Sequence, residues 1–244
     1  MRKSYRELTE EIKTDGERLK LIAALGSSDD LAYHYTLISE DWAAGGTLML
    51  ENSFDRHGEA GIVFLLERLR AFGTASKTDE SAAAGTATDT AYLAAKILSQ
   101  LRHRDFYAAR AKELAALLTA RWKISDIALR RKQIIALGWI GSEAEINLLI
   151  DSMQSDSDAL CRAWAAAALM QLSFHGVAAD VLRERTKNAF AAAIQKEGDL
   201  NAAGIMIEAA QTLFGKKWIS AAAAAESESI EKARKSALRF LGKA

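Results

Sequence analysis

The chain has 244 residues, half of them hydrophobic, and its 32 basic side chains balance 32 acidic ones. This length and apolar content allow a substantial core and exclude a disordered chain. No charge-free apolar run reaches the roughly 18 residues of a membrane span, and the N-terminal residues lack a signal-peptide apolar segment, so we expect a soluble, cytoplasmic protein without a membrane partner.

Composition indicates an all-α protein. The sequence contains no proline, against an average usage of about 5%, and it is rich in alanine. Both features favour helices joined by turns of Gly, Ser and Asp. Cys161 is the only cysteine, which excludes an internal disulfide and a cysteine-rich zinc site. We expect it to be a small buried hydrophobic residue.

In the N-terminal third, helix signals alternate with two irregular segments. Ser4 and Glu7 have the spacing of a capping box, which predicts that a helix begins there. Further helices are predicted at 15–25 and 62–72. Residues 43–61 are interrupted by four glycines and show no clear periodicity. Residues 74–90, rich in Ser, Thr, Ala and Gly, predict a long mobile loop.

From residue 92 onward the predicted helices follow one another in pairs. Ser142 and Glu145 form a second predicted capping box. The helix at 158–172 is apolar on nearly all sides, so we expect it to be sandwiched between neighbours, with Trp164 in the core. A one-sided terminal helix at about 227–242 is typical of a cap on a stack. The predicted spans are 92–101, 106–122, 126–140, 143–153, 158–172, 177–195, 201–214 and 227–242.

One spaced pattern occurs twice, 32 residues apart. Its first copy consists of Asp126, Arg130, Ala136, Leu137 and Ile140, and its second of Asp158, Arg162, Ala168, Leu169 and Leu172. A weaker copy contains Arg18, Ala24, Leu25 and Gly26. Self-similarity with such a period is typical of stacked helical units that cannot bury their apolar faces alone.

The pattern resembles the HEAT-like repeat family, in particular its short type named after phycobilisome lyases, most clearly over residues 125–173. The resemblance implies an α-solenoid of stacked antiparallel helix pairs, which we expect to form a single domain over residues 1–244. It implies no particular activity, because this scaffold hosts many unrelated functions.

The acid and the arginine of each copy stand four residues apart. This spacing predicts ion pairs from Asp126 to Arg130 and from Asp158 to Arg162, each on the surface of its own helix. In HEAT-like repeats the same two residues usually form a ladder along the stack. We therefore interpret them as structural, with ligand binding as the alternative.

The sequence contains no pattern that is typical of a catalytic, cofactor or metal site. His34, His57, His103 and His175 are scattered and lack zinc-binding spacing. Residues 55–59 form a dense polar cluster that could supply an acid and a base, but a solvated turn is the favoured interpretation. Glycine patterns of a phosphate loop or a hydrolase nucleophile are absent. We therefore predict a protein that is not an enzyme and has no cofactor.

The best candidate for a functional surface is a basic stretch in the middle of the chain. Residues 102–132 carry nine basic and three acidic side chains, whereas residues 1–60 carry seven basic and twelve acidic ones. The stretch predicts either a solvated face or a binding patch for an acidic protein or nucleic acid. The candidate residues are Arg102, Arg104, Arg110, Lys112, Arg121, Trp122, Lys123, Arg131 and Lys132.

Three functions fit the predicted scaffold. The leading hypothesis is a protein-binding solenoid that acts as an adaptor, an assembly factor or an inhibitor such as a toxin-immunity protein. A nucleic-acid-binding protein, similar to HEAT-like alkylpurine DNA glycosylases, is the first alternative, against which the overall neutrality counts. A chromophore lyase or chaperone is the second, suggested only by the repeat type.

Overall fold

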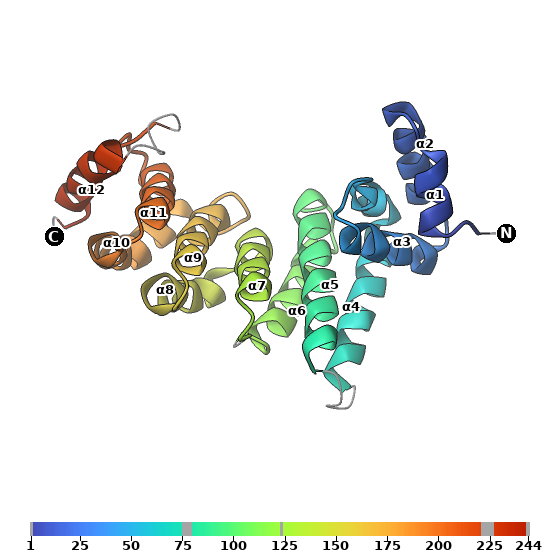
Figure 1. Cartoon of the computed structure of the whole chain (residues 1–244). Coiled ribbons are helices and arrows are strands. Elements are labelled where there is room, and N and C mark those ends of the chain that lie inside the picture. Colours follow the sequence, from blue (N-terminus) through green and yellow to red (C-terminus); the bar gives the residue numbers. More distant parts are fainter. Residues whose placement is uncertain (1, 75–79, 123, 221–226, 243–244) are drawn as a thin grey trace.

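The computed structural model describes residues 2–74, 80–122, 124–220 and 227–242, and within these residues the chain is helical and contains no strand. Figure 1 shows a bent stack of helices with the two termini at opposite ends. The prediction of an all-α solenoid is confirmed. The α-helices are α1 (Tyr5–Glu11), α2 (Asp15–Gly26), α3 (Leu31–Ala43), α4 (Gly58–Thr74), α5 (Glu80–Gln100), α6 (Tyr107–Thr119), α7 (Ile127–Ile140), α8 (Ile146–Ser155), α9 (Ala159–Leu172), α10 (Ala179–Lys196), α11 (Leu200–Leu213) and α12 (Ser227–Leu241), with 3₁₀ helices η1 (Leu50–His57) and η3 (Glu143–Glu145).

Two rows of helices build the stack. In one row α5 packs on α7, α7 on α9 and α9 on α11. The other row contains α4, α6, α8 and α10, of which α4 packs on α5, α8 on α9 and α10 on α11. Helix α12 packs against both α10 and α11, at the place where the terminal helix was predicted. The core therefore lies between the two rows.

The interior of this core follows the sequence repeat. Leu137 and Leu169, the equivalent residues of the two clearest copies, are both fully buried. Helices α7 and α9 approach closely, because a Cβ added to Gly138 would lie 2.8 Å from the Cβ of Ala168. Cys161 is buried as predicted, and burial raises the pKa of its thiol to about 11.

Polar caps define where the helices begin. Both predicted capping boxes, at Ser4 with Glu7 and at Ser142 with Glu145, are confirmed. In each box the serine hydroxyl accepts a backbone N–H bond and the glutamate accepts the N–H of the serine, which satisfies donors that a helix start leaves unpaired. Other helices begin after an aspartate whose carboxylate accepts a backbone N–H bond, at Asp30, Asp126, Asp158 and Asp199.

The predicted mobile loop at 74–90 is largely wrong. Helix α4 extends to Thr74 and α5 already begins at Glu80; residues 75–79 lie outside the described part of the chain. The alanines of this segment have high helix propensity, and Ala87 and Ala91 are buried in the stack. Thr90, also buried, donates its hydroxyl to the Thr86 carbonyl at 2.7 Å. Packing therefore stabilises a helix in a composition that resembles a loop.

The irregular segment at 43–61 forms a compact turn and η1. Its first part is organised by Asp41, which is fully buried and accepts bonds from the Tyr5 hydroxyl at 2.8 Å and the Leu48 N–H at 3.0 Å. Met49 has a left-handed backbone (φ 54°) at the entry to η1. Helix η1 then packs against α2, α3, α4 and α5. This 3₁₀ helix therefore joins the N-terminal helices to the stack.

Truncation of Leu137 or Leu169 to Ala should lower the free energy of unfolding by about 2–5 kcal/mol, because each change leaves a cavity in a packed core. Leu19→Ala is the matched control, since Leu19 is 52% exposed and should change little. Chemical denaturation of the three variants measures the difference. Equal stability of Leu137→Ala and Leu19→Ala would show that the described packing is wrong.

Candidate functional site

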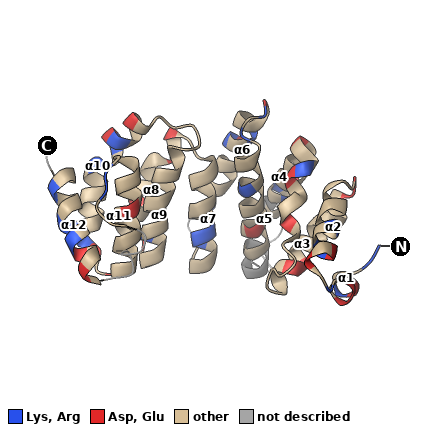
Figure 2. Ribbon diagram, turned by 90° about the horizontal axis from the view of Figure 1, so that it is seen from above, with Lys and Arg blue, Asp and Glu red and all other residues tan. Residues whose placement is uncertain are grey.

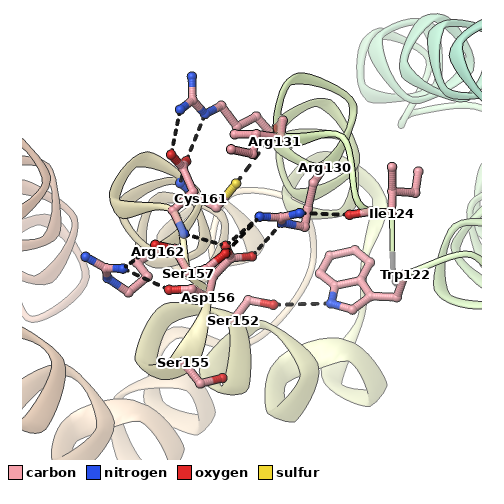
Figure 3. Close-up of polar contacts among 12 residues, drawn as sticks. Trp122, Ile124, Arg130, Arg131, Ser152, Ser155, Asp156, Ser157, Cys161 and Arg162 are labelled. Carbon is pink, nitrogen blue, oxygen red and sulfur yellow. Dashed lines mark hydrogen bonds and ion pairs between the residues drawn. The ribbon is translucent and has the colours of Figure 1, made fainter.

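Arg130 and Arg162 connect consecutive units of the stack (Figure 3). The Arg130 guanidinium donates to both carboxylate oxygens of Asp156, at 2.8 and 3.0 Å. One unit further on, Arg162 makes the same two bonds to Glu197, at 2.7 and 2.8 Å. Each guanidinium also donates to a carbonyl oxygen just before its own helix, that of Ile124 or of Asp156. Bidentate, charge-assisted bonds of this kind fix geometry strongly.

The predicted pairs of each arginine with the aspartate of its own helix are wrong. Asp126 and Asp158 instead accept backbone N–H bonds from Leu129 and Cys161. Because the aspartate caps its helix, the arginine extends to an acid of the next unit. Asp158 also accepts a bond from Arg131, which holds the pKa of its carboxyl at about 2. A ladder along the stack is present, but Arg130 and Arg162 pair in it with Asp156 and Glu197 rather than with Asp126 and Asp158.

The charged groups of the ladder pair with one another within the protein. A cavity of about 220 Å³ lies between the ends of α8 and α10, and Asp156, Arg162 and Glu197 line part of it. These charges already neutralise one another. The Glu197 side chain is only 1% exposed, and its bonds to Arg162 lower the pKa of its carboxyl. The cavity therefore offers no charged group of the ladder that needs a ligand.

The predicted basic patch is divided between the two rows. Arg110 and Lys112 lie on α6, whereas Arg131 and Lys132 lie on α7. Much of its charge is neutralised within the protein, by ion pairs of Arg110 with Glu59 and Glu113, of Arg131 with Asp158 and of Lys132 with Asp89. The stretch therefore does not form one continuous cationic surface.

Its other members occupy loops and helix ends. Arg102 donates to the Phe174 carbonyl at 3.0 Å, and the Trp122 indole donates to the Ser152 hydroxyl at 3.2 Å (Figure 3). Four cations of the stretch have no ion pair within the described residues, namely Arg102, Arg104, Lys112 and Arg121, of which Arg102 alone makes the side-chain bond given above. Lys123 lies outside these residues. The role of this stretch in partner binding stays a prediction.

His34 and His57, which are scattered in the sequence, meet where α3 contacts η1. His34 Nδ1 lies 2.8 Å from His57 Nε2, and His34 Nε2 lies 3.0 Å from the Leu50 carbonyl oxygen. A carbonyl oxygen only accepts, so His34 Nε2 carries the proton and its Nδ1 accepts the His57 N–H. Burial lowers the pKa of both imidazoles. Residues 55–59 were expected to form a solvated turn. Within them, His57 instead makes a partly buried contact with His34.

The outward side of α5, α7, α9 and α11 is a second candidate surface, which we call the α5–α11 face. The rings of Tyr92 and Trp139 are 5.2 Å apart on it, and both are half-buried. Figure 2 shows few charged positions on α7, α9 and α11, compared with α12 and the N-terminal helices. The face consists of Asp89, Tyr92, Lys96, Lys132, Ile135, Trp139, Trp164, Ala167, Gln171, Ile205, Glu208 and Thr212, all at least partly exposed.

Trp164 corrects one sequence-based expectation. It was placed in the core because its helix is apolar on nearly all sides, yet it is 36% exposed. Small residues fill the buried sides of α9, so its largest side chain lies outward. The clue in the sequence was the alanines at 163 and 165–168 around one tryptophan, which leave no interior space for an indole.

Comparison with known proteins supports the repeat architecture. Residues 81–170, which include α5 to α9, match the family model of HEAT repeats. Over this segment the chain is similar to HEAT repeats. The HEAT match does not distinguish the phycobilisome-lyase type. No curated protein and no solved structure matches the chain. Among the described residues, no helix is long and apolar enough to cross a membrane. The same residues contain no group of three or more His, Cys, Asp or Glu side chains that could hold a metal ion.

Arg162→Ala should lower the free energy of unfolding by about 3 kcal/mol or more, because it leaves the buried Glu197 carboxylate without its cation. The control is Arg6→Ala, which removes the exposed pair of Arg6 with Glu10 and should cost less than about 0.5 kcal/mol. Urea denaturation measures both. Similar losses in the two variants would contradict a structural ladder.

Acid should weaken the contact of His34 with His57. The pKa of both groups is lowered from the ordinary value of 6.5, so below that pH the unfolded chain takes up protons that the folded chain resists. The stability that the two neutral imidazoles contribute is therefore fully present above pH 6.5, and it is lost as the pH falls below this value. Asp29 and Asp55 oppose this effect at His57, because their charges favour its protonated form.

The variant that tests this is His57→Gln, whose amide still offers an N–H donor for His34 but takes up no proton. Its loss of stability between pH 8 and pH 5 should be smaller than that of the wild type. His103→Gln, which changes an exposed histidine outside this contact, is the matched control. A steeper dependence in His57→Gln than in the wild type would contradict the assignment.

Proposed function

We propose that the protein is a non-enzymatic, protein-binding HEAT solenoid and that its α5–α11 face holds a segment of the partner. The observation that carries the proposal is that Tyr92, Trp139 and Trp164, on three successive helices of one row, are all partly exposed, and that the first two rings are in contact. Helical spacing assigns the three residues to the same side of the row. Exposed aromatic side chains that converge on a rigid surface are typical anchors of protein interfaces. A row of packed helices also supplies an extended and rigid support.

The biological role could be that of an adaptor, an assembly factor or an inhibitor such as a toxin-immunity protein. All three need a rigid recognition surface and no catalytic group. The described residues contain no metal cluster. An acidic partner would additionally contact the unpaired cations of the basic stretch, Arg104, Lys112 and Arg121, which lie in or next to α6 in the other row.

Nucleic-acid binding is the alternative that the charges favour less. Affinity for a duplex requires many cations that can contact phosphates. Arg110, Arg131 and Lys132 are already paired with carboxylates, and they are divided between two rows. No residue specifically supports a chromophore lyase or a chaperone.

Trp164→Ala tests the proposal. Loss of a hot-spot aromatic costs about 2 kcal/mol or more, which corresponds to a drop in partner affinity of roughly 30-fold. The control is Phe174→Ala, which removes an aromatic that is 53% exposed in the loop after α9, outside the face. Proteins retained from a cell lysate by the immobilised wild type and by Phe174→Ala, but lost with Trp164→Ala, are the expected result.

The same three proteins should be titrated with random-sequence duplex DNA at low and moderate salt. Weak binding that does not depend on Trp164 agrees with the proposal. Tight binding with a steep dependence on salt would favour the nucleic-acid alternative instead.

A further inference from the structure

The buried residues of α9 and α11 follow the same spacing, which shows which outward residues of the two helices correspond. In α9 the buried residues Cys161, Ala165, Ala166, Leu169 and Leu172 have the same spacing as Ala202, Met206, Ile207, Ala210 and Leu213 in α11. Because the two helices pack on each other and their buried residues share one spacing, we infer that Ile205 is the α11 counterpart of Trp164 and that Glu208 is the counterpart of Ala167. Between α7 and α5, the ion pair of Lys132 with Asp89 likewise brings outward residues of two neighbouring helices together.

Ala167 is the smallest residue at the centre of the α5–α11 face. Repeat equivalence places Ile135 beside it on α7, as it places Glu208 on α11. Trp164 precedes it by about one helical turn on α9, and Trp139 follows Ile135 by about one turn on α7. The smallest residue of this part of the face thus has larger residues at the equivalent positions of both neighbouring helices.

The charges of the face indicate what kind of side chain fits. Lys132 is paired with Asp89, and Lys96 with Glu51 at 3.1 Å, so both lysines are neutralised. Glu208 is half-buried and has no hydrogen bond or ion pair within the described residues. The centre of the face therefore combines the Trp164 indole on α9 with one unneutralised carboxylate on the neighbouring helix α11. Indole rings attract cations through their faces, and a carboxylate does so through its charge.

We propose that this position binds a Lys or Arg side chain of the partner protein, with the stem across Ala167 and the charge against Glu208. The inference rests on the proposed function, since it names the chemistry that the α5–α11 face recognises. Long basic side chains cover apolar surface with their stems and keep the charged group at a polar partner. The face therefore selects a basic anchor, even where the partner is acidic elsewhere.

A random peptide library displayed on phage tests this without knowledge of the partner. Selection on the wild type should enrich peptides that contain Lys or Arg next to apolar residues. Glu208→Lys should lower the affinity of such a peptide by about tenfold, because a favourable charge pair becomes a repulsive one. Selection on this variant should enrich Asp and Glu instead. Its control is Glu184→Lys, which changes an exposed glutamate of α10 in the other row.

Two further variants separate this inference from the proposed function. Ala167→Trp fills the central position and should abolish peptide binding, whereas Ala108→Trp, at an exposed position of α6, should not. Circular dichroism and unfolding midpoints establish that each variant is folded; Glu208→Lys decides the matter should Ala167→Trp fail to fold. Selected peptides that need Trp164 but lack Lys and Arg, and that bind Glu208→Lys normally, would overturn the basic anchor and leave the proposed function intact. Peptides that bind Trp164→Ala as well as the wild type, or a failure to enrich any peptide, would contradict both.

Discussion

Close approach of the helices in one row is the constraint on which the rest of the structure depends. Gly138 faces Ala168 so tightly that a methyl group at Gly138 would clash, and alanines occupy much of the buried surface of α9 and α11. Small residues let helix backbones come close, but they leave no interior space for large side chains. The indole of Trp164 is therefore on the outside. The packing that holds the stack together thereby also produces the aromatic surface.

The arginine ladder complements this packing at the ends of the helices. Arg130 and Arg162 each bind an acid that lies just before the next helix of the row. Each of these ion pairs therefore positions the loop that leads into that helix. In α11 the position equivalent to Arg162 is Ala203, and the ladder ends there. Both of these ion pairs lie within the row that carries the face. They keep neighbouring helices in the register that brings its side chains together.

Features with a local or periodic cause could be predicted from the sequence, whereas contacts between distant segments could not. The capping boxes and the burial of Leu137 depend on spacing alone, and both are present. The segment at 80–90 resembles a loop in composition and becomes helical through packing against its neighbours. The contact of His34 with His57 joins residues 23 positions apart, which no periodicity indicates. Which acid each arginine binds likewise depends on how far the next unit is displaced.

The same distinction explains why a charge count over the sequence does not show which charges a partner would meet. Residues 102–132 are basic as a stretch, but alternate helices of a solenoid belong to opposite rows, so neighbours in sequence are separated in space. Several of these cations then meet acids from distant segments, such as Glu59 and Asp158. What a partner encounters is the charge that remains after this internal pairing. On the α5–α11 face that remainder is the carboxylate of Glu208, on the helix next to the one whose small-residue packing keeps Trp164 at the surface. The recognition that we propose there therefore has the opposite sign to that expected of the basic stretch.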